Sequence, residues 1–258
     1  MELLSAGDAA PVYALRGAPR GRGKLVFLHG MCGHALGYAQ SFQFSAARHG
    51  TLIAPQGDRR CGNGPWAMWS ADLQALDTRI VSAFRALGET APVRDVIIMG
   101  YSQGATRAEA LARKWPERYT RLVSMGAPRA TSAQGLEHLR AAVMMAGELD
   151  RQDQMKAGVR ALRRARVPTT FMEIPGARHG AMGPTPEKTM GTALDWLSEN
   201  SRKNSRKEIA GPASNGGAAG IPSADRAHDS RDLRAPTLDH SPSDRGALRL
   251  QGIEKRAD

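Results

Sequence analysis

The sequence predicts an α/β fold, in which an open and mostly parallel β-sheet carries helices on both faces. Short apolar, β-branched segments alternate with amphipathic helical segments along most of the chain. The segment Val96–Met99 is apolar throughout, which is typical of a central parallel strand covered on both sides. The connections between segments are short, so we expect no lid domain.

The N-terminal half predicts three strands and two helices. The apolar and β-branched sequences PVYAL, KLVFL and TLIA predict strands at 11–15, 24–28 and 51–54. Apolar residues recur at three- and four-residue intervals in two longer segments, which predicts helices at 37–48 and 71–87.

The C-terminal half continues the alternation. Four runs of apolar or β-branched residues predict strands at 95–99, 121–125, 141–146 and 169–174. Amphipathic segments between and after these runs predict helices at 103–115, 132–138, 151–165 and 186–199.

The composition changes near residue 200. All 4 Trp, 4 Tyr and 5 Phe residues lie at or before Trp196. The remainder is rich in Gly, Pro, Ser, Ala, Asp and Arg, and such a segment cannot bury enough apolar surface to offset its ordering entropy. We therefore expect a folded domain at 1–201 and a disordered basic tail at 202–258. The alternative for the tail is a partner-binding segment around 247–253.

Charge and hydropathy limit the function classes. The chain has 36 Lys and Arg against 25 Asp and Glu, a net charge of +11. The basic residues are scattered, so we expect solvated faces and no nucleic-acid partner, with a nucleic-acid role of the tail as the alternative. No apolar run approaches the roughly 18 residues of a membrane span, and Met1 is followed by Glu2 with no leader pattern. A cytoplasmic location is expected, unless an upstream leader is missing.

The sharpest local motif is Gly100-Tyr101-Ser102-Gln103-Gly104, a G-x-S-x-G sequence between a predicted strand and a predicted helix. A serine on such a tight turn needs neighbours without side chains, and Gly100 and Gly104 meet that need. The motif predicts Ser102 as a nucleophile. The alternative is an ordinary glycine-rich turn with an exposed serine.

A serine nucleophile needs a base, and the base needs an acid to orient it. His179 follows the last predicted strand, and Asp150 follows the strand before it. The chain order Ser102, Asp150, His179 is the order of nucleophile, acid and base in enzymes whose serine lies on such a strand-to-helix turn. Glu148 and Asp153 remain alternatives for the acid.

The loop after the strand at 24–28 begins His29-Gly30-Met31. Backbone N–H groups of Met31 and Gln103 are the expected oxyanion hole, because both follow strand ends beside the nucleophile. We interpret the His29 side chain as a structural anchor of this loop and not as a base.

These motifs together resemble the α/β-hydrolase superfamily. The segments that carry the resemblance are 28–30, 100–104, 147–150 and 176–180. The Ser-Gln-Gly elbow and the compact size are similar to the phospholipase/carboxylesterase group, which includes acyl-protein thioesterases. In that group a loop tryptophan often lines the acyl pocket, and the resemblance places Trp66 and Trp69 there. The alternative is that both tryptophans, at the start of a helix, pack into the core.

The predicted function is a serine hydrolase that cleaves esters or thioesters of small or short-acyl substrates, acting as a monomer or homodimer with no metal or organic cofactor. A peptidase or amidase on the same scaffold is the first alternative, and a non-catalytic binding protein the second. Cys32 and Cys61 lie in two loops near the site. They are expected as free thiols in a reducing cytosol, or as a disulfide if the protein is exported. Cys32 is also a rival nucleophile.

Overall fold

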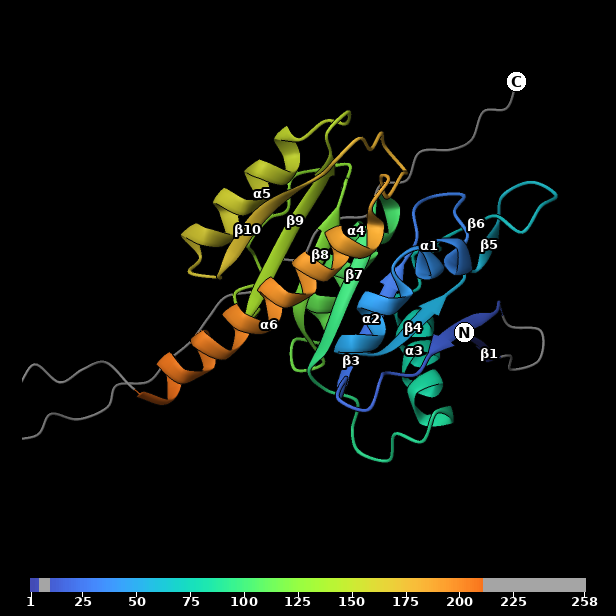
Figure 1. Ribbon diagram of the computed structural model, residues 1–258, viewed down its shortest axis with the longest axis horizontal. Coiled ribbons are helices and arrows are strands. Elements are labelled where there is room, and N and C mark those ends of the chain that lie inside the picture. Colours follow the sequence, from blue (N-terminus) through green and yellow to red (C-terminus); the bar gives the residue numbers. More distant parts are fainter. Residues whose placement is uncertain (5–9, 211–258) are drawn as a thin grey trace, which may run out of the picture. The chain divides into compact units, whose positions relative to one another are not determined.

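The computed structural model describes residues 1–4 and 10–210, with side chains to Arg202, and centres on one eight-stranded sheet (Figure 1). Its spatial order is β1-β2-β4-β3-β7-β8-β9-β10. The strands are β1 (Glu2–Leu4), β2 (Val12–Leu15), β3 (Gly23–Leu28), β4 (Gly50–Pro55), β7 (Val96–Tyr101), β8 (Tyr119–Met125), β9 (Ala141–Gly147) and β10 (Thr169–Ile174). The six neighbouring strands β4, β3, β7, β8, β9 and β10 are parallel, and β2 pairs antiparallel with both β1 and β4. The predicted fold class is confirmed.

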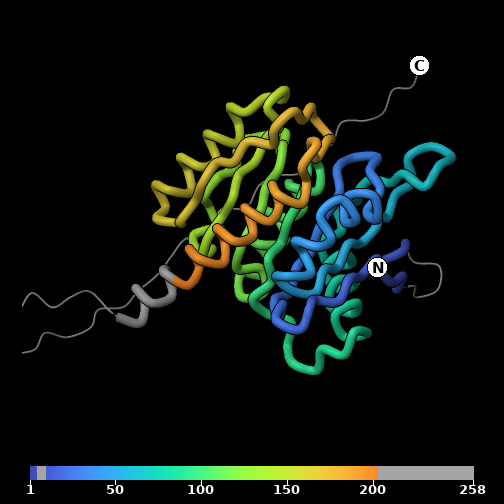
Figure 2. Tube along the Cα trace, in the orientation of Figure 1, coloured from blue at the N-terminus to red at the C-terminus, as the bar shows by residue number. Residues whose placement is uncertain are grey.

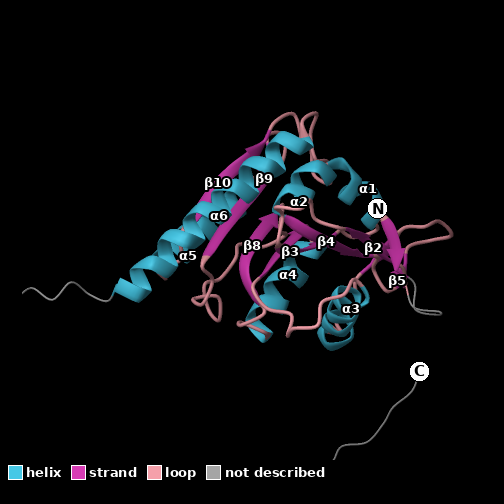
Figure 3. Cartoon of the chain, turned by 60° about the horizontal axis from the view of Figure 1, so that its bottom comes forward, coloured by secondary structure: helices cyan, strands magenta, loops and turns pink. Residues whose placement is uncertain are grey.

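Helices cover both faces of the sheet (Figure 3). One face packs against α3 (Leu73–Ala86), α4 (Gln103–Lys114) and α5 (Asp153–Arg164). The other face packs against α1 (Ala35–Ser41), α2 (Gln43–His49) and α6 (Pro186–Ala210). Within the part of the chain that the structure describes, no inserted domain interrupts this alternation.

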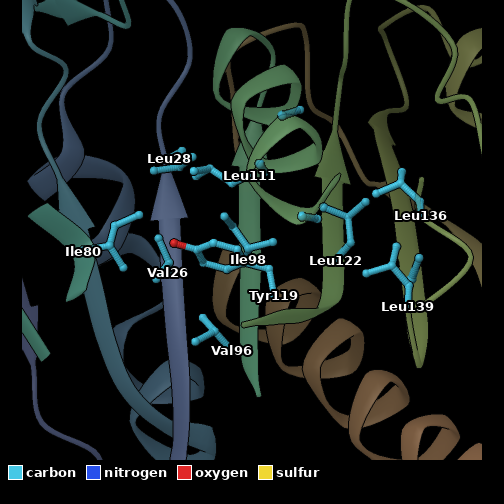
Figure 4. Close-up of a cluster of buried hydrophobic side chains, with 14 of the residues drawn as sticks. Val26, Leu28, Ile80, Val96, Ile98, Leu111, Tyr119, Leu122, Leu136 and Leu139 are labelled. Atoms are coloured by element: carbon cyan, nitrogen blue, oxygen red, sulfur yellow. The ribbon is translucent and has the colours of Figure 1, made fainter. Parts of the chain in front are cut away.

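Residues of the central strands alternate between the two cores. In β7, Ile98 joins the core under α4, while Ile97 and Met99 join the core under α6. Figure 4 shows Val26, Ile98 and Leu122 on three neighbouring strands of the first core. Fully burying each such side chain contributes about 1.5–3 kcal/mol, which explains why these strands are apolar on both faces.

Two predicted helices differ in the structure. The segment 37–48 forms two helices because Phe42 breaks the helical backbone (φ −133°) and is fully buried, with its ring 5.3 Å from that of Phe27. The helix predicted at 132–138 is wrong. Gly135 takes a positive φ of 72°, and two tight turns place Leu136 and Leu139 in the core without a helix.

Other boundaries shift for local reasons. Helix α3 begins at Leu73 because the Asp72 side chain accepts a hydrogen bond from the Ala75 N–H, so both loop tryptophans lie before the start of α3 and not within it. A short hairpin of β5 (Arg59–Arg60) and β6 (Ala67–Met68) was not predicted.

The C-terminal helix α6 continues to Ala210, past the expected domain boundary at Ser201 (Figure 1). Figure 2 traces its first part, from Pro186 to about the expected boundary, in orange. The rest of the expected disordered tail, including the alternative partner-binding segment at 247–253, lies outside the described residues.

The loop after β3 is anchored by His29, which is fully buried. The Gly57 N–H donates to its Nε2 at 2.9 Å, so the ring proton lies on Nδ1 and is donated to the Gly30 carbonyl at 2.7 Å. Burial lowers the pKa of His29 from 6.5 to about 4; the Gly30 carbonyl opposes this shift, and the charges of His34 and Arg79 add to it. His29 is therefore a neutral structural group, in agreement with its interpretation from sequence.

The free energy of unfolding is expected to fall as the pH drops from 6.5 to 4. In this window the unfolded chain binds a proton at His29 that the folded protein excludes. The contribution of neutral His29 to the free energy of unfolding is therefore complete above pH 6.5 and lost near pH 4. The loss amounts to about 3 kcal/mol, or about 1.4 kcal/mol per pH unit. Urea unfolding at several pH values is expected to show this extra slope in the wild-type protein but not in His29→Asn. Equal slopes in the two proteins would contradict it.

Candidate active site

Ser102 occupies a strained turn between β7 and α4. Its φ of 52° lies in the left-handed region, which is rare for a residue with a side chain. A Cβ at Gly100 would lie 2.3 Å from the Gly104 carbonyl oxygen, and one at Gly104 would lie 2.1 Å from that of Leu28. The turn closes only because both positions are glycine, as the motif predicts.

The turn brings Ser102 to a chain of hydrogen bonds. His179 Nε2 lies 3.0 Å from Ser102 Oγ, and His179 Nδ1 lies 2.7 Å from Asp150 Oδ2. The other oxygen of Asp150 accepts the Arg151 N–H at 2.7 Å, which fixes the carboxylate plane. The His179 side chain is 51% exposed and that of Asp150 13%, so the imidazole is open to a substrate while its acid is shielded.

The two alternative acids lie elsewhere. Glu148 Oε2 accepts the Gly176 N–H at 2.8 Å, so it supports the loop that carries His179 without contacting the imidazole. Asp153 is the first residue of α5. The structure therefore brings Asp150 to His179 and leaves the other two carboxylates away from it.

Two tyrosines hold the backbone beside His179. Tyr38 donates its hydroxyl proton to the Gly180 carbonyl at 2.7 Å, and the Gly180 N–H donates to the hydroxyl of Tyr101 at 2.9 Å. The Tyr101 ring lies edge-on to the His179 ring at 5.6 Å, and burial raises the pKa of Tyr101 to about 12. Sequence reasoning missed both tyrosines, although Tyr101 occupies a variable position of the elbow motif.

Gly126 was also missed. It follows β8 with a φ of 53°, and a Cβ there would lie 3.4 Å from His179 Cε1 and 3.5 Å from Asp150 Oδ2. Its position at the carboxyl end of a strand beside the elbow was the available sequence signal. A Cβ at this position would lie in van der Waals contact with both members of the hydrogen-bonded pair, and the positive φ itself disfavours a side chain there.

The expected oxyanion donors lie beside Ser102. A Cβ at Gly30 would lie 3.5 Å from Ser102 Cβ, so the backbone leading to Met31 passes directly by Ser102. Gln103 begins α4, where N–H groups have no partner within the helix. Among the residues described here, no protein group accepts either N–H, so both remain able to bind a ligand oxygen.

The two loop tryptophans have different places. Trp69 is 4% exposed, its indole N–H donates to the His29 carbonyl at 2.7 Å, and its backbone pairs with the Gln103 side chain at 3.0 and 3.3 Å. Trp69 is thus a core residue, in contrast to the pocket role predicted for it. Trp66 is 51% exposed.

Trp66 lines an open groove of about 610 Å³ beside the site. Met31, Tyr38, Gly180 and Met182 also line it, so the groove runs from the expected oxyanion loop to the loop after His179. Its side chains are mainly apolar, which suits an apolar part of a substrate.

Cys32 and Cys61 form a disulfide, with their Cα atoms 5.4 Å apart. Cys32 therefore presents no thiol, and the prediction of free thiols does not apply to this structure. In the described part of the chain, no group of three His, Cys, Asp or Glu residues could hold a metal ion. None of its helices combines the length and apolar character that a bilayer span requires.

Solved structures with the same architecture match the chain at low sequence identity. A fluorophosphonate-binding serine hydrolase of Staphylococcus aureus matches with a TM-score of 0.55 and 15% identity, over 76% of this chain and 96% of its own. A monoacylglycerol lipase of Paleococcus ferrophilus gives 0.52 and 16%, over 78% and 100%. Acyl-protein thioesterase 2 of Zea mays gives 0.52 and 16%, over 74% and 98%.

No protein-family model and no curated protein sequence matches the chain. At such low identity the structural matches establish the architecture alone. The chain has the α/β-hydrolase fold.

Proposed function

We propose that the protein is a serine hydrolase that cleaves carboxylic esters or thioesters through an acyl-enzyme on Ser102. The observation that carries the proposal is the row of hydrogen bonds from Ser102 Oγ through His179 to Asp150. A serine hydroxyl is a poor nucleophile at neutral pH, and this row supplies the base and the group that orients it.

The mechanism follows from the geometry. His179 Nε2 takes the Ser102 proton while Oγ attacks the acyl carbon, and Asp150 stabilises the imidazolium that forms. The N–H groups of Met31 and Gln103 are the proposed donors to the oxyanion. His179 then protonates the leaving group, and water repeats the sequence on the acyl-enzyme. No step uses a metal or an organic cofactor.

The groove beside the site supports small or short-acyl substrates. It is open and shallow, and Trp66 and Met31 offer apolar contact to one end of a substrate. We propose that Trp66, but not Trp69, contacts the substrate. The triad geometry suits amides as well as esters, so a peptidase or amidase is the alternative that a panel of acyl esters and aminoacyl amides would separate.

The cytoplasmic location stays a prediction, and the Cys32–Cys61 bond bears on it. Disulfides persist in oxidising compartments and are rare in the cytosol. Trapping free thiols at the moment of cell lysis would show whether the bond exists where the protein acts.

A fluorophosphonate is expected to label Ser102 and no other residue, because within the described ranges only this hydroxyl has a base within hydrogen-bond distance on a strained turn. Peptide mapping of the labelled protein checks the site. Ser102→Ala is expected to abolish labelling and esterase activity, whereas Ser132→Ala, which changes an exposed serine outside the site, is expected to retain both. Complete inertness toward the probe and toward activated esters would favour a non-catalytic binding protein.

Asp150→Asn is expected to reduce kcat by about 10³- to 10⁴-fold, because an amide cannot stabilise the imidazolium and favours the wrong tautomer. Glu148→Gln, the matched change, is expected to reduce kcat by less than about tenfold, since the Glu148 carboxylate accepts the Gly176 N–H and does not contact His179. Steady-state kinetics of folded protein, with active sites titrated by the fluorophosphonate, measures both. A larger loss in Glu148→Gln than in Asp150→Asn would reverse the assignment.

Trp66→Ala is expected to raise KM about tenfold for esters with an apolar acyl chain, and to leave acetate esters within about twofold. The loss of about 60 Å² of apolar contact corresponds to about 1.5 kcal/mol. A chain-length series of p-nitrophenyl esters measures the effect. Phe44→Ala, which removes another exposed aromatic side chain outside the groove, is the control. Equal changes at every chain length would show that Trp66 does not contact the acyl group.

A further inference from the structure

Two loops beside Ser102 are joined into one unit. We define the oxyanion loop as residues 29–35 and the Trp66 loop as residues 56–69. An antiparallel bridge links them, in which Gly33 and Ala67 exchange N–H to carbonyl hydrogen bonds of 3.1 Å each. The Cys32–Cys61 disulfide adds a covalent link at the adjacent position.

Gln56 joins the same two loops from inside the protein. It follows β4 and is only 4% exposed. Its Oε1 accepts the Ala35 N–H at 2.7 Å, and its Nε2 donates to the carbonyls of Gly33 at 3.1 Å and Pro65 at 3.0 Å. One amide therefore uses its acceptor and both of its donor protons on three backbone groups of the two loops.

The backbone of Gln56 is itself fixed to the sheet. Its N–H donates to the Pro11 carbonyl at 2.8 Å, and its carbonyl accepts a hydrogen bond from Arg79 Nη2 at 2.9 Å. The three side-chain bonds of Gln56 thus extend from a point that the core holds in place. A buried amide with all its hydrogen bonds made is costly to disturb, since each broken bond leaves an unpaired buried group.

The oxyanion loop needs such support because its tip has little packing of its own. Met31 and Cys32 are both exposed, and Cys32 has a φ of 50°, a conformation that a free residue rarely adopts. The direction of the Met31 N–H depends on the backbone at the tip. An oxyanion donor acts only when it points within a few tenths of an ångström of the required position.

We propose that Gln56 and the Cys32–Cys61 disulfide are positioning residues, which together hold the Met31 N–H in the orientation that stabilises the oxyanion. The inference rests on the proposed serine hydrolase function and adds to it the part that keeps the oxyanion hole formed. It also implies that activity depends on the redox state. A phosphine and water convert the S–S bond to two thiols and phosphine oxide, and this frees the tip of the oxyanion loop from the Trp66 loop.

The first test compares Gln56→Glu with Gln40→Glu in the full chain. Glutamate at position 56 keeps an acceptor for Ala35 but loses both donor protons, while Gln40 is exposed and gives the same charge change outside the unit. We expect kcat of Gln56→Glu to fall about 10- to 100-fold per active site titrated with a fluorophosphonate, with KM within about threefold. Gln40→Glu is expected to match the wild-type protein.

The second test keeps the native sequence. Treating the folded protein with a phosphine is expected to lower kcat about tenfold, and reoxidation is expected to restore it. The double variant C32S/C61S is expected to show the same low kcat and no further response to the phosphine.

A trifluoromethyl ketone, which forms a tetrahedral adduct on the nucleophile, separates positioning from a merely structural role. Its inhibition constant is expected to rise in proportion to the loss in kcat/KM, while the pH profile of kcat keeps its shape. If Gln56 and the disulfide only stabilised the fold, their loss would lower the number of titratable active sites. The inhibition constant and kcat/KM of each remaining site would then be unchanged.

Labelled Ser102 together with wild-type kcat per site in Gln56→Glu and in the reduced protein would overturn the inference and leave the proposed function intact. Absence of fluorophosphonate labelling in the wild-type protein would instead overturn the proposed function.

Discussion

The site depends on how closely the first turn of α4 approaches the ends of β3 and β7. The hypothetical Cβ distances of 2.3 Å at Gly100 and 2.1 Å at Gly104 are below any real contact, so only glycine permits this approach. The approach does three things at once. It holds Ser102 at its positive φ, it places the N–H of Gln103 at the free start of α4, and it brings the loop after β3 alongside. The positions of the proposed nucleophile and of the proposed oxyanion donors are therefore consequences of one steric constraint.

Sequence reasoning identifies the parts of the site that are local. The elbow is a five-residue motif, and the order of Ser102, Asp150 and His179 follows from which strands they end. Sequence reasoning preferred Asp150 but kept Glu148 as an alternative acid, because both carboxylates lie within a four-residue turn. The structure separates them, since Glu148 is occupied by the Gly176 N–H while Asp150 meets the imidazole.

What sequence reasoning missed consists of contacts between distant segments. The Tyr38 hydroxyl bonds the Gly180 carbonyl 142 positions away, and no periodicity or motif records such a pair. The role of Gln56 was missed for the same reason. The failed helix at 132–138 is a different case, because its apolar spacing was real. Leu136 and Leu139 do pack into the core, but Gly135 lets two turns achieve this without a helix.

Trp66 and Trp69 lie in the same loop of the joined unit but have different environments. The two residues are three positions apart, yet one is half exposed and the other buried. Strand β6 ends between them, and after it the Gln103 side chain binds both backbone groups of Trp69. The indole of Trp69 lies 4.7 Å from the ring of neutral His29, which in turn holds Gly30 and Gly57.

A continuous hydrogen-bond network therefore runs from Gln103, the residue after the proposed nucleophile, through Trp69 to the oxyanion loop. Trp66 lies at the outer end of the same loop, where the disulfide and Gln56 support the backbone and leave its indole free to contact a ligand. The same hydrogen bonds and disulfide fix the backbone on the inner side of the two loops and hold the exposed Trp66 side chain on the outer side. A side chain that is to bind a substrate at low entropic cost needs a fixed backbone beneath it, and for Trp66 the backbone proposed to orient the oxyanion donor also supplies that support.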